Sequence, residues 1–459
     1  MSGKIAFEKI ESLRGRLEKI AKDMWEQPEG PYRETKACAW ISELLREEGF
    51  AVEIGAGGVP TAIKAVWGSG SPVCGVLGEL DALPGLSQKL VTHKEAAVPG
   101  GHGQGCGHNL LGVGALGGAI ALKEEMERAK LPGTVIYYGC PAEEVLTGKS
   151  FMARGGAFDG LDYCIDYHPG ITTGVRLSTG TALNSANFYF KGVTAHAGGD
   201  PQNGRSALDA VELMNVAANY LREHVTSDVR IHYMITNGGE APNIVPDKAS
   251  SRYFVRALTR EGVVEVYDRL VKCARGAAMM TDTELEIEYL GGCYQMMPNM
   301  EFSKLLHEIM NGVEQEPWTE DEKKFAAELN ATMPELYEKN IARYGAEKGA
   351  ALHEGVTPLV VYDGFGSSDV GDVQHIVPGV SFGTATANIG APGHSWQFSA
   401  CSGHSIGMKG MILACKVIAL FGLRIIESPE VLEAARLEFA QSMDGKSYIC
   451  PITPEMKVP

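Results

Sequence analysis

The chain has 459 residues, of which 44% are hydrophobic and 21% are charged, and its formal net charge is −16. This length is too great for one ordinary core, so we expect a soluble globular protein of two or more domains. The acidic balance and the lack of Lys/Arg clusters argue against nucleic acids and anionic membranes as partners.

Residues 1–29 predict a charged amphipathic helix without the apolar segment of a signal peptide. We see no uninterrupted apolar stretch long enough to cross a membrane. The ten cysteines are scattered and form no CxxC pair, which is typical of a reducing compartment. We therefore expect a cytoplasmic protein.

The first part of the chain alternates between predicted strands and helices. Strands are expected at residues 71–80, 133–140 and 161–168, with helices at residues 108–129 and 150–158. Such alternation predicts an α/β domain with a parallel or mixed sheet, whose functional groups gather at the carboxyl ends of the strands. Asp81, Glu143, Glu144 and His168 all lie at or just after the end of a predicted strand.

The middle of the chain predicts a different architecture. Residues 184–193, 230–239, 248–258 and 284–292 are typical of strands, and residues 204–225 and 260–280 are typical of helices. The order βαββαβ is the ferredoxin-like pattern. We expect an inserted α+β domain at 183–295, between the two parts of the catalytic domain, 1–182 and 296–459. The second part contains a charged helical region near 314–354, a strand and loop at 380–396, and an apolar helix at 405–423.

Five potential metal ligands are distributed over the predicted strand ends and loops. A cysteine or histidine of this kind is more often a packed or surface residue when it is considered alone. Together they are enough for two metal ions that share a bridging ligand and leave a position for water. The set is Cys106, His108, Glu144, His168 and His394. Glu143, next to Glu144, is left to act as the general base.

Three short motifs suggest other chemistry, and each has a better explanation. Gly112–Gly117 matches the dinucleotide fingerprint but lacks an immediately preceding strand, so small residues in a packed helix explain it better. Ser405 lies in a G-x-S-x-G motif, but no histidine follows it for a hydrolase triad. The "GKS" at 148–150 lacks the first glycine of a phosphate-binding loop, because position 143 is Glu.

The ordered motifs "GELDALPG", "GCGHN", "PAEE", "YHPG", "GVTAHAGGDPQNGRSALDA", "NIVPDKA" and "APGHSW" resemble those of the aminoacylase and carboxypeptidase G type metallopeptidases. The "CGH" resembles the amidohydrolase branch of that family, and within it the B-type group of the p-aminobenzoyl-glutamate hydrolases. The resemblance implies a mixed-sheet catalytic domain with two metal ions and an inserted ferredoxin-like lid domain that mediates dimerisation.

The resemblance also implies roles for individual residues. It implies that Cys106 bridges two Zn or Mn ions, that Glu143 is the general base and that Asp81 orients a metal ligand. It implies that His196, in the lid, reaches into the partner's active site to stabilise the oxyanion. Asn243 and Arg205 resemble lid positions near the substrate, and Arg205 or Arg256 can also supply the cation that a substrate carboxylate needs.

Two positions depart from the family's pattern. Glu79 stands where the wider family has the histidine ligand of H-x-D, and the Cys106/His108 pair would compensate for it. The amidohydrolase branch usually has Asp after "CGH", whereas this chain has Asn109.

We therefore expect a metal-dependent hydrolase that cleaves the amide bond of an N-acyl or N-aroyl amino acid, such as p-aminobenzoyl-glutamate or a related conjugate. The partner chain is expected to be identical, giving a homodimer through the lid, or else a paralogue. A non-catalytic metal-binding subunit that supports an active paralogue is the alternative, and the presence of Glu143 beside a full ligand set argues against it. A serine hydrolase that uses Ser405 is a third, disfavoured hypothesis.

Overall fold

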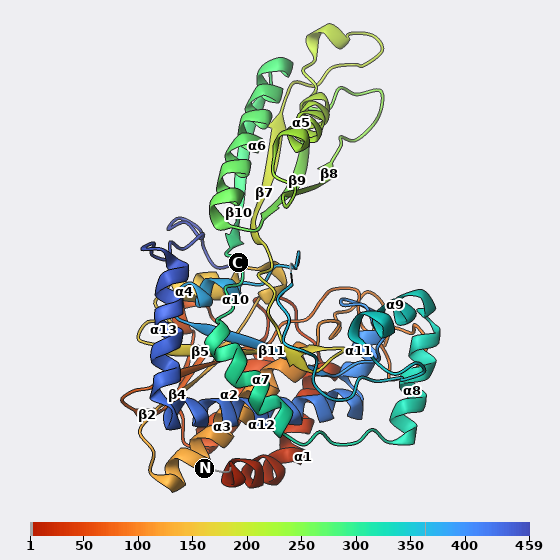
Figure 1. Ribbon diagram of the computed structural model, residues 1–459. Helices are drawn as coiled ribbons and strands as arrows, with labels where there is room; N and C mark the ends of the chain where they lie inside the picture. The colour runs from red at the N-terminus through yellow and green to blue at the C-terminus, as the bar shows by residue number, and fades with distance from the viewer. Residues whose placement is uncertain (1–2, 363) are drawn as a thin grey trace.

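The computed structural model describes residues 3–362 and 364–459, which form a mixed α/β body and a projecting arm (Figure 1). The body contains a seven-stranded sheet in the order β1-β2-β4-β3-β5-β11-β6. Strands β3, β4, β5 and β11 are parallel, β1 and β2 are antiparallel to their neighbours, and β6 is antiparallel to β11. The strands are β1 (Ala51–Ile54), β2 (Ile63–Ser69), β3 (Val73–Glu79), β4 (Gly133–Cys140), β5 (Tyr163–Gly170), β6 (Gly174–Val175) and β11 (Gly379–Ala385).

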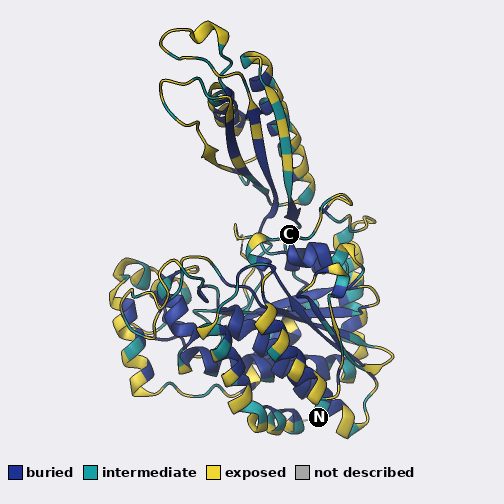
Figure 2. Ribbon diagram, turned by 180° about the vertical axis from the view of Figure 1, so that it is seen from behind, coloured by how far each residue is buried: buried dark blue, intermediate teal, exposed yellow. Residues whose placement is uncertain are grey.

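Helices cover both faces of this sheet. One face packs against α3 and α12, on which α1 packs in turn within the larger apolar core, and the other face shares the second core with α4 and α10. The parallel strands β3, β4, β5 and β11 are almost continuously buried, as expected for strands covered on both sides (Figure 2). The helices of the body are α1 (Lys4–Glu26), α2 (Thr35–Glu47), α3 (His108–Ala129), α4 (Gly148–Arg154), α7 (Met300–Gly312), α8 (Glu320–Ala331), α9 (Pro334–Tyr344), α10 (Val370–Gln374), α11 (Trp396–Ser402), α12 (Ser405–Glu427) and α13 (Pro429–Met443).

The arm is an antiparallel four-stranded sheet in the order β10-β7-β9-β8, with α5 and α6 packed against it. This order is that of a ferredoxin-like βαββαβ unit, as the sequence predicts. Its elements are β7 (Ala182–Lys191), α5 (Ala207–Leu221), β8 (Arg230–Asn237), β9 (Lys248–Ala257), α6 (Arg260–Thr281) and β10 (Glu284–Cys293). The division of the chain at 183 and 295 into domains stays a prediction.

Helix α12 corrects the expectation that no segment is long and apolar enough to cross a membrane. By length and composition it qualifies, with a mean hydropathy of 1.8 in its most apolar window. However, 83% of that window is buried inside the body, where α12 packs against α3 and β11. A core helix of this kind meets the same criteria as a membrane span.

Candidate metal centre

The predicted metal ligands come together at the end of the large sheet where its parallel strands terminate. Glu143 and Glu144 follow β4 in a short 3₁₀ turn, and His168 lies near the end of the neighbouring strand β5. Cys106 and His108 lie in the loop and first turn that open α3, and His394 follows β11. Because parallel strands end at the same edge, segments far apart in the sequence deliver their side chains to one place.

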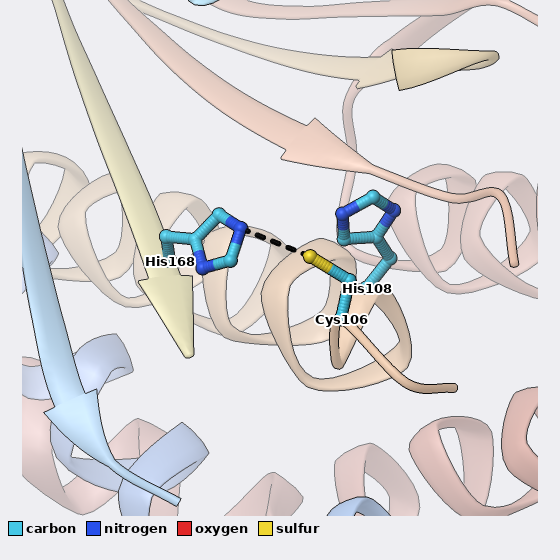
Figure 3. A group of neighbouring side chains, drawn as sticks. All are labelled: Cys106, His108 and His168. Carbon is cyan, nitrogen blue, oxygen red and sulfur yellow. Dashed lines mark hydrogen bonds between the residues drawn. The ribbon is translucent and has the colours of Figure 1, made fainter. Parts of the chain in front are cut away.

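The donor atoms form two groups that have Cys106 in common. Cys106, His108 and His168 make up one group, and Cys106, Glu144 and His394 make up the other, with the donor atoms of each group within 4.8 Å of one another. The Cys106 Sγ lies 3.3 Å from the His168 Nε2 (Figure 3). The His394 Nε2 lies 3.6 Å from a carboxylate oxygen of Glu144.

Hydrogen bonds to backbone carbonyls fix which nitrogen of each buried imidazole is free. The His168 Nδ1 lies 2.8 Å from the Pro169 carbonyl, and the His108 Nδ1 lies 3.0 Å from the Asp81 carbonyl. A carbonyl only accepts, so the Nδ1 of each ring carries the proton and donates. In the neutral ring, the Nε2 then presents its lone pair to the site, as a metal ligand requires.

Asp81 holds the turn that carries the two glutamates. Its Oδ1 accepts from the backbone N–H of Glu143 at 3.2 Å, and its Oδ2 accepts from that of Glu144 at 3.0 Å. The Oδ1 also lies 3.2 Å from the His108 Nδ1. A single buried carboxylate thereby orients a histidine and both glutamates.

The turn is strained, and a second buried carboxylate supports it. Ala142 and Leu146, on either side of Glu143–Val145, both have left-handed backbone conformations, with φ of 56° and 58°. Glu34 accepts from the backbone N–H of Ala142 at 2.9 Å and from the Thr61 hydroxyl at 2.8 Å. Strain of this kind persists where the surroundings over-determine the backbone, which is typical of functional sites.

Several buried polar atoms of the site lack a partner in the described part of the chain. They are the Glu79 Oε2, the His108 Nε2 and the Glu144 Oε1. Unpaired buried polar atoms are costly, and all three are electron-pair donors to a cation. A thiolate, three imidazoles and carboxylates are a donor set that suits zinc, with manganese also served by the carboxylates. The residues present therefore fit a bound metal.

Burial shifts the pKa values of the titratable groups in the site. Burial, with the neighbouring charges of Glu79 and Asp369, raises the pKa of Glu143 well above its ordinary value. Burial raises the pKa of Glu144 to about 7, and it raises the pKa of the Cys106 thiol to about 12. Burial and the nearby Arg176 lower the pKa of His168, which keeps its imidazole neutral. These shifts favour the uncharged forms of the two glutamates, the thiol and His168, whereas the pKa of His108 is raised, in spite of its burial, by Cys106 and Asp81.

The sequence reasoning missed a buried ion-pair cluster behind the glutamates. The Lys149 Nζ lies 2.5 Å from the Glu79 Oε1 and 2.7 Å from the Asp369 Oδ1, and all three side chains are at most 1% exposed. Lys149 belongs to the "GKS" motif, so the structure explains this lysine by an ion pair. Nothing in the local sequence of α4, which also carries Arg154, distinguishes this lysine from a surface one.

The family model described as "Peptidase family M20/M25/M40" matches residues 75–382, which include the donor residues named above except His394. The chain belongs to this family.

Named relatives agree with this membership. The chain is 37% identical to the B-type subunit of the p-aminobenzoyl-glutamate hydrolase of Escherichia coli, over 96% of each chain. It is 27% identical to the Xaa-Arg dipeptidase of Mus musculus, over 95% of this chain and 91% of the relative. The fold is similar to that of a dinuclear metal binding peptidase of the M20 family from Bacillus subtilis, with a TM-score of 0.59 and 18% identity, over 91% and 99% of the two chains. As a member of this family of dinuclear metallopeptidases, the chain is a hydrolase.

The predicted lid residues of this M20 protein divide into two sets. Arg256 lines the same cavity of about 680 Å³ as Cys106, Glu143 and His394. Arg176, which the sequence reasoning missed, lines it as well. The remaining lid residues lie elsewhere: they are His196, Asn243 and Arg205.

These three residues lie at the far end of the arm. Ala182 and Ala257 pair at the base of the arm, and Lys191 and Lys248 pair at its tip. Ten strand residues span about 30 Å at roughly 3.3 Å each. His196 and Asn243 lie in loops beyond the tip, and Arg205 there forms an ion pair with Asp282 at 2.9 Å. Within one chain the structure therefore does not bring these residues to the metal donors.

The competing motifs have structural explanations in this fold. A Cβ on Gly117 would lie 2.5 Å from the Cys415 Sγ, so the glycines of α3 allow its close contact with α12. Ser405 opens α12 and donates to Glu322 at 2.6 Å, rather than standing on a strand-to-helix turn. Asn109 donates to the carbonyls of Ala21 and Ser402, which an aspartate is unable to do. These two hydrogen bonds explain why this chain has Asn109 where the amidohydrolase branch usually has Asp.

Proposed function

We propose that this M20 protein is a metal-dependent amidohydrolase that cleaves the amide bond of N-acyl or N-aroyl amino acids carrying a free carboxylate. The observation that supports this most is the division of labour between the adjacent glutamates. Glu144 belongs to a donor group with Cys106 and His394, whereas Glu143 belongs only to a third group, with Glu79 and His108, that lacks Cys106. Glu143 is nevertheless 6% exposed and lines the same cavity.

In this proposal two divalent ions, Zn or Mn, would be held by the two donor groups that have Cys106 in common. His108 and His168 would serve one ion, and Glu144 and His394 would serve the other. When bound, such a pair of ions polarises a carbonyl and lowers the pKa of water. Glu143, which lines the cavity beside the donor groups, takes a proton from the attacking water and delivers it to the leaving amine. Asp81 keeps Glu143, Glu144 and His108 in place through the contacts described above.

The cavity walls support a substrate with an anionic and an apolar part. Arg256 donates to the Ser367 hydroxyl at 2.8 Å, through one nitrogen of its guanidinium group. Its other donors and those of Arg176 are suited to a substrate carboxylate. Apolar side chains line other parts of the wall and suit an acyl or aroyl group; they are Leu183, Phe254, Met296 and Tyr362.

Arg176 and Arg256 also favour one of the activities that the relatives' names suggest over another. A leaving amino acid with a cationic side chain would be repelled by Arg176 and Arg256, so the Xaa-Arg dipeptidase type is disfavoured. A glutamate-like amino acid would gain from both. The alternative of a non-catalytic subunit is disfavoured because Glu143 and the complete donor set are present.

We also propose that the arm forms a dimer, either with an identical chain or with a paralogue. The edge strand β8 has no neighbour on one side in the described sheet, and seven of its eight residues are exposed. Tyr220 on α5 is 74% exposed, and Met234 on β8 is 59% exposed. An unpaired, partly apolar edge is suited to pairing with another chain. His196, whose Nδ1 accepts from Gly198 and Gly199, would then offer its Nε2 to the partner's site as an oxyanion donor, with Asn243 beside it.

One screen tests the reaction and the substrate class. Purified protein is demetallated, reconstituted with Zn²⁺ or Mn²⁺, and assayed against amides that share an aroyl group and differ in the amino acid: Glu, Gly or Arg. We expect hydrolysis only with metal, and a preference for p-aminobenzoyl-glutamate over its arginine analogue. Full activity in the demetallated protein, or no hydrolysis of any amide, would contradict the proposal.

A further inference from the structure

Glu79 and His108 face each other in an arrangement that a protein alone does not satisfy. The Glu79 Oε2 and the His108 Nε2 lie 3.2 Å apart, and their side chains are 1% and 0% exposed. In spite of this distance, neither atom has a hydrogen-bond partner among the residues described.

The Nε2 is the nitrogen of His108 that remains for another partner, because the Nδ1 of the ring donates to the Asp81 carbonyl at 3.0 Å. The Glu79 Oε2 that faces it offers lone pairs. A metal ion between these two atoms would therefore satisfy both of them at once.

Lys149 determines which oxygen of Glu79 faces the site. Its ammonium group lies 2.5 Å from the Oε1 and stands fully buried between Glu79 and Asp369. This ion pair holds the Oε1 and leaves the Oε2 facing His108. Glu79, His108 and Glu143 also bring donor atoms within 4.8 Å of one another.

We propose that Glu79 is a further ligand of the ion that His108 binds, held in place by Lys149. This inference rests on the proposed metal centre. Two donor atoms at 2.0–2.2 Å from one ion are about 3 Å apart when they subtend a right angle at it, close to the separation seen here. Because a carboxylate is a harder donor than an imidazole, Glu79 favours Mn²⁺ relative to Zn²⁺ at this position.

The test compares Glu79→Gln with Asp369→Asn. Both substitutions remove one buried negative charge and one bond to Lys149, but Asp369 does not contact His108. Metal content and affinity are measured by titrating demetallated protein with Mn²⁺ and with Zn²⁺, and the Tm of the demetallated variants reports their folding. We expect Glu79→Gln to weaken one of the two equivalents by at least about 10- to 100-fold, the loss that even an outer partner of a ligand causes. The loss should be larger for Mn²⁺ than for Zn²⁺, and Asp369→Asn should bind both equivalents like the wild type.

A purely structural role for Glu79 gives a different result. If Glu79 only balances Lys149, the two variants should lose similar stability and keep similar metal affinity, which would overturn the inference. In Co²⁺-substituted protein, only Glu79→Gln should change the visible absorption that reports coordination number; unchanged spectra would also overturn it. Cys106→Ser separates this inference from the proposed centre. If Cys106→Ser retains both equivalents, the centre itself is wrong; if it loses metal and Glu79→Gln does not, only the role of Glu79 is wrong.

Discussion

Asp81→Asn should release the glutamate turn from its anchor and weaken the metal site without unfolding the chain. In the wild type the two carboxylate oxygens accept from the backbone N–H groups of Glu143 and Glu144, and the Oδ1 also faces the His108 Nδ1 proton. An asparagine replaces one of these oxygens by an NH₂ group. The less costly orientation keeps the Oδ1 and turns the NH₂ toward the N–H of Glu144, so one buried donor loses its acceptor.

The structure sets the size of both effects. A buried donor without a partner costs about 1–3 kcal/mol of stability. Because Asp81 orients His108 and Glu144 from outside the donor set, its loss should weaken metal binding by about 10- to 100-fold. We therefore expect a moderate fall in the free energy of unfolding of the demetallated protein and a separate loss of metal affinity.

The matched control lies at the other end of the same strand. The Asp162 Oδ2 accepts from the N–H of Val73, where β3 begins, whereas Asp81 follows its end. Asp162→Asn should lose comparable stability in urea denaturation and bind metal normally. If Asp81→Asn bound both equivalents with wild-type affinity, or if both variants lost affinity alike, the anchoring role would be refuted.

Three other predictions address single side chains. Glu143→Gln should keep both metals and lose about 10²–10⁴-fold in kcat, whereas Glu144→Gln should first lose metal, as elemental analysis and kinetics would show. Burial raises the pKa of Glu34 from 4.5 to about 7. Because a raised carboxyl pKa stabilises the fold below about 4.5 and loses that contribution by about 7, the margin of the wild type over Glu34→Gln should shrink between pH 5 and 8, by up to about 3 kcal/mol, in urea denaturation of demetallated protein. If His196 acts in the partner's site, mixing His196→Ala and Glu143→Gln chains should restore about a quarter of wild-type activity, because half of the dimers are mixed and each has one intact site.

Each of these predictions has a clear contrary result. Similar metal loss in the two glutamine variants would remove the distinction between base and ligand. A pH-independent difference between the wild type and Glu34→Gln would show that Glu34 does not titrate in this window. No recovery after confirmed subunit exchange would exclude a donor supplied by the partner.

The donor set was predictable because its signals are local. Cys106 and His108 are separated by a single residue, Glu143 and Glu144 are adjacent, and His168 lies near the end of a strand rich in aromatic and apolar residues. In a parallel sheet the ends of such strands meet, so the sequence places these side chains together without knowledge of any long-range contact. The ferredoxin-like arm was predictable for the same reason, because the apolar residues of each of its elements recur at the spacing of a strand or of a helix.

The supporting residues were not predictable, because their roles exist only between distant segments. Glu34 and Ala142 are 108 positions apart, and Lys149 and Asp369 are 220 positions apart. A buried lysine or glutamate has the same letters as a surface one, so only its packing reveals an ion pair. Residues of the arm such as His196 present the opposite difficulty. A motif predicts their chemistry, but within one chain they lie beyond the tip of the arm, about 30 Å from its base at roughly 3.3 Å per residue along β7.

The adjacent glutamates are best understood through the charge that surrounds them. Five carboxyl groups lie close together in the site. Four of them are buried, those of Glu79, Asp81, Glu143 and Asp369, and the side chain of Glu144 is only 6% exposed. Against these five carboxyl groups, the described residues of the site bury one ammonium group, that of Lys149. Like charges in such surroundings are tolerated only when they are protonated or when cations join them. Protonation would disable Glu143 as a base, whereas two divalent ions would balance the excess negative charge and leave Glu143 beside the reacting bond. On this reasoning the metal ions complete the electrostatics of the core as well as the chemistry of the site.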